Sequence, residues 1–291
     1  MKLALFVGLG VFGALYLAVL IGAVLRARRA GAAGGQEVAP TFFEVALGFV
    51  TCFFDTLGIG SFAPTTAALK LRGLVADEKI PGTLNVGHTL STLVQAYIFI
   101  AIVSVDMATL VLMIVAAVLG SWLGAGFVGR ASRRKIQIGM GLALLAAAAI
   151  FLLQIFQLTP PGGDTRSLAG WKLGIGFTVN FVLGVLMQVG VGLYGPCMIL
   201  VSLLGMNPQA AFPIMMGSCA FLMPVGSIKF IQGGRYSLRT TVGLTLGGVP
   251  AVLLAAFIVK SLPLAALRWL VVGVVLYAAL SMLRSAAVEA R

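Results

Sequence analysis

The chain has 291 residues, of which 60% are apolar and 10% are charged. Soluble domains contain roughly 45–50% apolar and about 25% charged residues, so this composition excludes a soluble globular domain, a disordered chain and a disulfide-framed secreted domain. The net charge of +12 is typical of basic residues in the cytoplasmic loops of a membrane protein, and nucleic acid is not expected as a partner. We therefore predict an all-α polytopic membrane protein.

Seven apolar runs are long enough to cross a membrane, which requires about 20 residues. In chain order they are Leu3–Leu25, Ile80–Val105, Met107–Val128, Lys135–Leu158, Gln209–Ile231, Leu238–Val259 and Leu264–Leu283. The basic cluster of Arg26, Arg28 and Arg29 follows the first run instead of preceding it, so we interpret residues 1–30 as a transmembrane helix and not as a signal peptide. The same basic residues predict an N-terminus outside the cell.

Two further segments, Thr41–Leu71 and Gly174–Leu204, are too long for one ordinary span and are interrupted by glycine and proline. A shift of 132 residues aligns them with 8 identities in the 40 columns from Phe49 to His88, and five of these identities are glycine or proline. Because these two residue types fix the shape of the backbone, the match predicts two repeats. We place them in residues 41–158 and 174–285 of a single transmembrane domain.

Loop charges predict how the two repeats are oriented. If each broken segment dips into the membrane as a re-entrant helical hairpin, 15 of the 20 basic residues lie in the cytoplasm. The five outside are Lys2, Arg166, Lys172, Lys260 and Arg268. A single crossing by each segment would instead place the basic loops 26–29 and 130–135 on opposite sides. Three crossings then separate the two repeats, which are therefore expected to be inverted.

Broken helices at matching positions of two inverted halves are typical of a transporter's binding site. A half-helix that begins near Pro64 or Pro196 leaves backbone N–H groups unpaired, and such groups bind anions. A simple kink in packed helices is the alternative. We predict that the anion is bound by Gly58, Gly60, Ser61, Pro64, Thr65, Asn85, Gln188, Gly190, Gly192, Tyr194, Pro196, Ser218 and Cys219.

Two titratable residues are candidates for carrying a coupling proton. His88 is the only histidine, and imidazole titrates near neutral pH. A carboxylate such as Asp55 costs about 2.5–3.5 kcal/mol at the centre of a membrane helix, so it is usually functional or paired. Each could instead make only a structural hydrogen bond to a neighbouring helix. Cys197 and Cys219 have a simpler interpretation too, as small packing residues.

The sequence contains none of the common catalytic or cofactor motifs. It has no Walker motif, no Cys-x-x-Cys, no histidine pair and no Gly-x-Ser-x-Gly. We therefore expect neither an enzyme nor a bound metal or cofactor. An intramembrane triad of His88, Asp55 and Ser61 or Ser91 would leave the repeats unexplained.

The segment Gly-Phe-Val-Thr-Cys-Phe-Phe-Asp-Thr-Leu-Gly-Ile-Gly-Ser-Phe-Ala-Pro (48–64), with Ile-Pro-Gly-Thr-Leu-Asn-Val-Gly-His (80–88), resembles the TauE/SafE sulfite exporter family, also called the toluene-sulfonate uptake permease family (TSUP). Gly-Leu-Tyr-Gly-Pro-Cys (192–197) and Phe-Pro-Ile-Met-Met-Gly-Ser-Cys-Ala (212–220) resemble its second half. The resemblance covers residues 40–285. It implies transport of sulfite, a sulfonate or an organosulfonate across a bacterial or archaeal plasma membrane.

These observations together predict a secondary transporter that exports a small sulfur-containing anion, coupled to a proton or ion gradient, by alternating access around the two broken helices. His88 or Asp55 would take the proton. The expected partners are the anion and membrane lipid, and a homodimer is left open. A channel-like facilitator of a small solute or anion is the alternative, since it would need no titratable coupling group. A second alternative is a membrane assembly factor that transports nothing itself.

Overall fold

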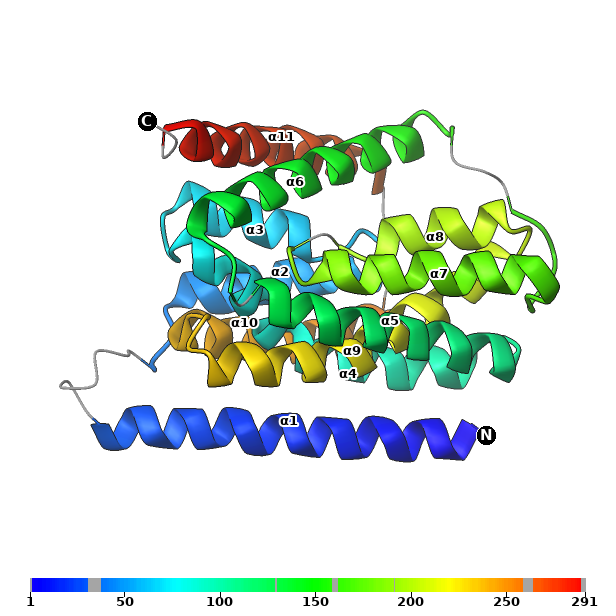
Figure 1. The fold of residues 1–291 in the computed structure, drawn as a ribbon, viewed down its shortest axis with the longest axis horizontal. Coiled ribbons are helices and arrows are strands. Elements are labelled where there is room, and N and C mark those ends of the chain that lie inside the picture. Colours follow the sequence, from blue (N-terminus) through cyan, green and yellow to red (C-terminus); the bar gives the residue numbers. More distant parts are fainter. Residues whose placement is uncertain are drawn as a thin grey trace.

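The computed structural model describes residues 2–30, 38–128, 130–158, 162–190, 192–258 and 264–288. Val259, the last residue of the predicted span Leu238–Val259, and Lys260, one of the five basic residues predicted to lie outside, are not among the described residues. Regular structure in the described ranges is helical (Figure 1). The α-helices are α1 (Lys2–Ala30), α2 (Phe42–Thr56), α3 (Phe62–Leu71), α4 (Ile80–Ile102), α5 (Met107–Val128), α6 (Arg133–Ile155), α7 (Gly170–Met187), α8 (Tyr194–Leu203), α9 (Ala211–Gln232), α10 (Leu238–Ile258) and α11 (Leu264–Val288). Short 3-10 turns, η2 (Asp77–Lys79) and η3 (Pro208–Ala210), precede α4 and α9.

Among the described residues, seven helices are long and apolar enough to cross a membrane: α1, α4, α5, α6, α7, α9 and α10. The predicted all-helical architecture is confirmed for these residues, and the seven helices are compatible with a multi-pass membrane protein. Six of these helices match predicted spans, and the predicted span Leu264–Leu283 corresponds to α11. The remaining helix, α7, is the first arm of the second broken segment and begins at Gly170, four residues before the predicted start.

Each broken segment consists of a longer helix, a short irregular stretch and a ten-residue helix. Glycines with positive φ interrupt the helices, because this backbone conformation is incompatible with a right-handed helix: Gly58 (φ 88°), Gly60 (φ 91°) and Gly190 (φ 102°). Helix α8 begins at Tyr194, 132 residues after the start of α3 at Phe62. Helices α9, α10 and α11 each begin 131 residues after α4, α5 and α6.

The two ends of each broken segment lie beside one another. The Arg72 guanidinium, after α3, stacks 4.2 Å from the centre of the Phe43 ring in the first turn of α2. In the second segment, Lys172 near the start of α7 donates from Nζ to the carbonyl oxygen of Leu204, after α8, at 3.0 Å. Figure 1 shows that α2 and α7 begin at opposite ends of the molecule. Each segment therefore turns back toward the end at which it began.

The start of α2 is fixed by a capping box. The Thr41 backbone N–H donates to Glu44 Oε2 at 2.7 Å, and the Glu44 N–H donates to Thr41 Oγ1 at 3.4 Å. The same carboxylate accepts from Arg239 Nε at 3.1 Å and from Thr240 Oγ1 at 2.8 Å, both in the first turn of α10. These contacts hold the first broken segment against α10.

The helices pair across the middle of the sequence. We call residues 42–155 (α2–α6) the first half and residues 170–288 (α7–α11) the second half. The four most extensive helix pairs are α2 with α10, α4 with α9, α5 with α7 and α6 with α11, so each joins one half to the other. Glycines allow two of these close contacts: Gly120 of α5 lies against the backbone of Phe181, and Gly247 of α10 against that of Val45.

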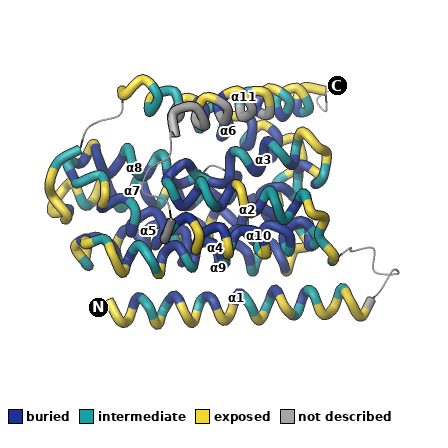
Figure 2. The backbone as a smooth tube through the Cα atoms, turned by 180° about the vertical axis from the view of Figure 1, so that it is seen from behind, coloured by how far each residue is buried: buried dark blue, intermediate teal, exposed yellow. Residues whose placement is uncertain are grey.

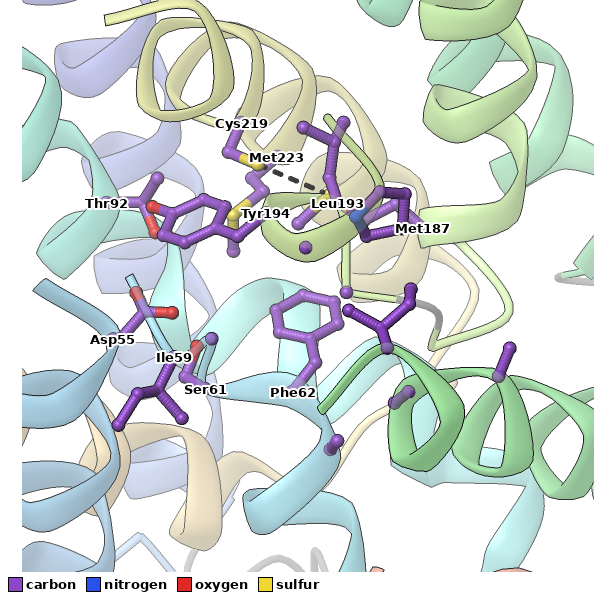
Figure 3. A pocket seen from close by; sticks show the side chains of 18 of the residues that line it. Asp55, Ile59, Ser61, Phe62, Thr92, Met187, Leu193, Tyr194, Cys219 and Met223 are labelled. Atoms are coloured by element: carbon purple, nitrogen blue, oxygen red, sulfur yellow. Dashed lines mark hydrogen bonds between the residues drawn. The ribbon is translucent and has the colours of Figure 1, made fainter. Parts of the chain in front are cut away.

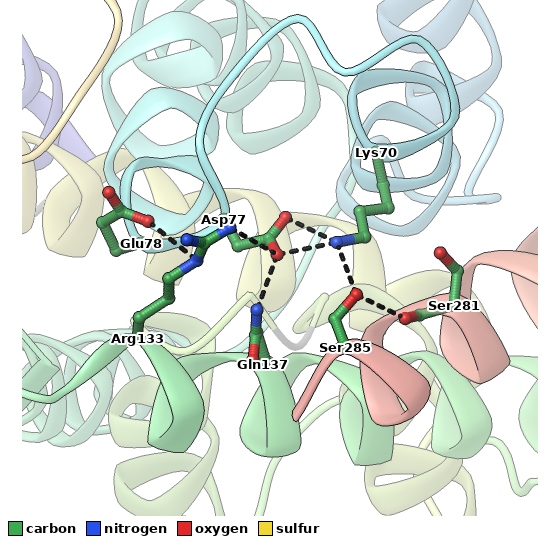
Figure 4. A network of polar contacts seen from close by, with 7 residues as sticks. All are labelled: Lys70, Asp77, Glu78, Arg133, Gln137, Ser281 and Ser285. Carbon is green, nitrogen blue, oxygen red and sulfur yellow. Dashed lines mark hydrogen bonds and ion pairs between the residues drawn. The ribbon is translucent and has the colours of Figure 1, made fainter. Parts of the chain in front are cut away.

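Helix α9 is largely buried at the centre of the molecule, whereas α1 lies at one edge and exposes most of its surface (Figure 2). Helices α6 and α11 form the opposite edge. Asp77, the first residue of η2, lies near the start of α6 and connects this edge of the molecule to α3 (Figure 4). Asp77 accepts from Lys70 Nζ at 2.6 Å and from Gln137 Nε2 at 2.9 Å, and Lys70 also donates to Ser285 Oγ at 3.2 Å.

A candidate binding cavity between the two helix breaks

A cavity with an empty volume of about 680 Å³, its open side included, lies where the two helix breaks meet (Figure 3). Figure 3 shows the side chains of the first break facing those of the second half across it. The cavity also borders the C-terminal part of α6, through Ala146, Ala147, Ile150 and Gln154. Seven of the predicted site residues line it: Asp55, Gly60, Ser61, Gly192, Tyr194, Pro196 and Cys219.

The N-termini of α3 and α8 both meet this cavity. The first backbone hydrogen bonds of these helices are from the Thr65 N–H to the Ser61 carbonyl and from the Cys197 N–H to the Leu193 carbonyl, each 3.0 Å long. The N–H groups before these residues have no carbonyl one turn earlier to bind. Ala63 and Gly195 occupy equivalent positions in the two helices, and both line the cavity. Two partly positive helix ends therefore converge on one space.

A chain of hydrogen bonds connects the two breaks. Asp55 is 4% exposed, and its Oδ2 accepts from Gln95 Nε2 on α4 at 2.9 Å. Tyr194, the first residue of α8, donates its hydroxyl to Gln95 Oε1 at 2.6 Å. Ser61 lies beside Asp55 on the same wall of the cavity. The carboxyl group of the first break is thus linked through one glutamine to the second break.

Gln95 was not among the predicted site residues. It continues the polar face of α4 that Asn85, His88 and Thr92 mark at three- and four-residue spacing. Extending that pattern by one turn would have found it. Phe62, Met187 and Met223 also line the cavity and carry no polar signal in the sequence.

His88 lies behind the cavity wall and not on it. Its Nε2 is 3.2 Å from Thr65 Oγ1, and its Nδ1 is 3.2 Å from Cys52 Sγ. The ring of Phe62, which lines the cavity, packs against the imidazole with the two centroids 5.9 Å apart. Both ring nitrogens therefore have protein partners, as in a structural histidine.

The remaining predicted residues support the wall from behind. Asn85 donates to the carbonyl of Pro81 at 3.0 Å, Gln188 donates to Ser121 Oγ at 3.0 Å, and Ser218 Oγ accepts from Asn180 at 3.1 Å. The predicted site residues that do not line the cavity are Gly58, Pro64, Thr65, Asn85, His88, Gln188, Gly190 and Ser218.

The two walls of the cavity differ in chemistry. The first half contributes the Asp55 carboxyl group and the hydroxyls of Ser61 and Thr92. The residues that correspond to Asp55 and Ser61, 132 positions later, are Met187 and Leu193. The residue that corresponds to Thr92, 131 positions later, is Met223. The described lining residues include no Lys, Arg or His, and Asp55 is their only carboxyl group. An anion in this cavity would depend on backbone, hydroxyl and side-chain amide donors, since Gln154 also lines it.

Comparison with known proteins gives no match: no protein-family model, no curated protein and no solved structure matches the chain. Within the described residues, no group of three or more His, Cys, Asp and Glu side chains could hold a metal ion.

Proposed function

We propose that this protein is a secondary transporter of a small sulfur-containing anion, and that its substrate binds in the cavity between the two helix breaks. The observation that carries this proposal is the convergence of two half-helix N-termini, one from each half, on one cavity that contains a single carboxyl group. The seven apolar helices are compatible with a transporter.

The donors around the cavity suit an oxyanion. Sulfite and sulfonate oxygens accept hydrogen bonds from backbone N–H groups at a helix N-terminus, and the helix dipole adds a favourable potential. The hydroxyls of Ser61 and Thr92 lie on the same wall. The sulfur-containing class of the substrate comes from the resemblance of residues 48–64 and 192–197 to the TauE/SafE family.

Asp55 is our candidate for the coupling residue. An anion and an ionised carboxylate in one poorly hydrated cavity repel strongly, and protonation of Asp55 removes that repulsion. Binding of the anion would then require a proton, so both would move in the same direction. Export would need an outward anion gradient larger than the opposing proton gradient. His88 is less suitable because Thr65 and Cys52 hold it behind the wall.

We also propose that the two halves are inverted repeats and that α2–α3 and α7–α8 are re-entrant hairpins. The equal spacing of the corresponding helices and the side-by-side ends of each broken segment support this proposal. It places Arg72 and Arg130 in the cytoplasm and Asp164 outside, with the N-terminus outside as well.

A membrane-impermeant maleimide tests this topology on Arg28→Cys, Arg130→Cys and Asp164→Cys in intact cells, since the re-entrant arrangement places the basic loop 26–29 in the cytoplasm together with Arg130. The three native cysteines are buried, so they give little background. We expect only the cysteine at position 164 to react before the cells are lysed. Reaction of just one of the cysteines at positions 28 and 130 would contradict the re-entrant arrangement.

Flux into liposomes containing the purified protein tests the function. We expect saturable uptake of labelled sulfite, sulfoacetate or taurine, accelerated when the outside is acidic. Asp55→Asn should abolish the effect of the pH gradient. Asp106→Asn is the matched control, because Asp106 accepts from the Thr109 N–H at the start of α5 at 2.8 Å and asparagine caps helices equally well.

Three outcomes would count against the proposal. Unsaturable flux that ignores the pH gradient would favour the channel-like facilitator. A pH-driven flux that survives Asp55→Asn and is lost in His88→Ala would return the coupling role to His88. No flux of any sulfur-containing anion, from protein shown to be folded, would reject the substrate class.

A further inference from the structure

Three sulfur atoms gather on the second-half wall of the cavity. Met187 ends α7, and Cys219 and Met223 lie one turn apart on the same face of α9. All three side chains line the cavity and are almost completely buried, with exposures of 3%, 0% and 0%. Figure 3 shows Cys219 and Met223 side by side, with a contact from Cys219 to Met187.

The spacing of these sulfur atoms suits a shared metal ion. Cys219 Sγ lies 3.6 Å from Met187 Sδ. Two sulfur ligands that are each about 2.3 Å from one metal ion are about 3.8–4.0 Å apart in tetrahedral or trigonal geometry. The pair could therefore bind one ion with a shift of a few tenths of an ångström.

The kind of metal follows from the ligands. Thiolate and thioether sulfur are soft donors that favour monovalent copper, whereas magnesium and calcium require oxygen ligands. The described lining residues include no Lys, Arg or His, and the Asp55 carboxyl group faces the same space, so no cationic side chain opposes a cation there. The other two cysteines do not line the cavity: Cys52 contacts His88, and Cys197 is buried within α8.

We propose that Met187, Cys219 and Met223 form a binding site for Cu(I) in this cavity. Binding replaces the Cys219 thiol proton with the metal ion and releases that proton to water, with no change of oxidation state. The proposal does not depend on anion transport, since it concerns binding to the protein alone.

The test is a titration of the purified full-length chain in detergent with Cu(I), under anaerobic reducing conditions and in competition with bicinchoninate. We expect one Cu(I) per chain after gel filtration. Met187→Leu, Met223→Leu and Cys219→Ser should each weaken binding by about tenfold or more, since loss of even a supporting group typically costs 10- to 100-fold. X-ray absorption should show sulfur neighbours at about 2.3 Å.

Matched controls separate this site from general sulfur content. Met216→Leu and Cys197→Ser change buried residues that do not line the cavity, so they should leave Cu(I) affinity unchanged. The two methionine-to-leucine variants conserve volume and keep the test valid if Cys219→Ser does not fold. Absence of bound Cu(I), or equal affinity in the site and control variants, would overturn the proposal, whatever the liposomes show for anions.

Discussion

At the level of single residues, the cavity depends on a buried hydrogen bond between Tyr194 and Gln95. Tyr194→Phe would remove the hydroxyl and leave Gln95 Oε1 without its 2.6 Å partner in a dry environment. An unsatisfied buried acceptor costs about 1–3 kcal/mol, so we expect the variant to unfold at a lower temperature. Thermal unfolding in detergent measures this change.

Tyr97→Phe is the matched control for this prediction. The Tyr97 hydroxyl donates to the Phe6 carbonyl at 2.8 Å, but the residue is 38% exposed, so water or lipid headgroups can replace the bond. We expect a change within about 0.5 kcal/mol. Equal losses in the two variants would mean that the Tyr194–Gln95 bond has no special weight.

The sequence identified part of this site and missed the rest for a physical reason. Asp55, Ser61 and Tyr194 stood out because polar groups are expensive inside a membrane. That same argument selected His88 and Asn85, which do not line the cavity and instead bond to Cys52, Thr65 and the Pro81 carbonyl within the protein. Only the three-dimensional packing distinguishes a polar group that faces a cavity from one that faces a neighbouring helix.

At the level of elements, the first break depends on a backbone conformation that only glycine adopts without strain. Gly60 has φ 91°, and a Cβ added there would meet nothing within 4 Å. The cost of Gly60→Ala is therefore a backbone cost alone, about 1–2 kcal/mol for a left-handed conformation. Denaturant titration in mixed micelles would measure this loss.

Gly174→Ala provides the opposite case. Gly174 lies within α7, and a Cβ there also meets open space. Alanine is favoured over glycine in a helix by about 0.5–1 kcal/mol, so this variant should be as stable as the native chain or more stable. If Gly60→Ala were equally stable, the break would not require glycine at that position.

The positions of the helices could be read from the sequence more readily than their partners. Glycine and proline marked both breaks because they act on the local backbone. The pairing of α2 with α10, or of α6 with α11, leaves no such mark, since α9 and its neighbours are apolar on most sides. Gly120 and Gly247 allow close contact between helices, but a glycine in an apolar helix does not identify the partner helix.

At the level of the whole molecule, the proposed transport by alternating access around the cavity predicts a second arrangement of α6 and α11. In this structure the cavity borders the C-terminal part of α6. Near the other end of α6, where that helix begins, Lys70 of α3 contacts Ser285 of α11. Shifts of 132 and 131 residues relate Lys70 to Ser202 and Ser285 to Gln154. We expect Ser202 and Gln154 to approach one another in the opposite state, as Lys70 and Ser285 do here.

A bifunctional thiol-reactive linker can test this exchange in liposomes. Linking Lys70→Cys to Ser285→Cys should stop flux, and linking Ser202→Cys to Gln154→Cys should stop it as well. A chain that carries all four cysteines and is already linked between positions 70 and 285 should not form the second link. Normal flux through a chain fully linked at positions 70 and 285 would show that α11 does not move away from α3.

Because every extensive helix pair takes one member from each half, neither half has a hydrophobic core of its own. A chain that ended after α6 would therefore expose the inner faces of α2, α4, α5 and α6 to lipid, because their partner helices would be missing. The same pairing between halves favours assembly of the protein from two separately expressed fragments. Two fragments divided between α6 and α7 and made in one cell should reassemble, because each offers the other all four of its missing surfaces. If the two halves are inverted repeats, as proposed, their common ancestor was a chain of about half this length. Two copies of that chain, inserted in opposite directions, would have been needed to form one functional protein.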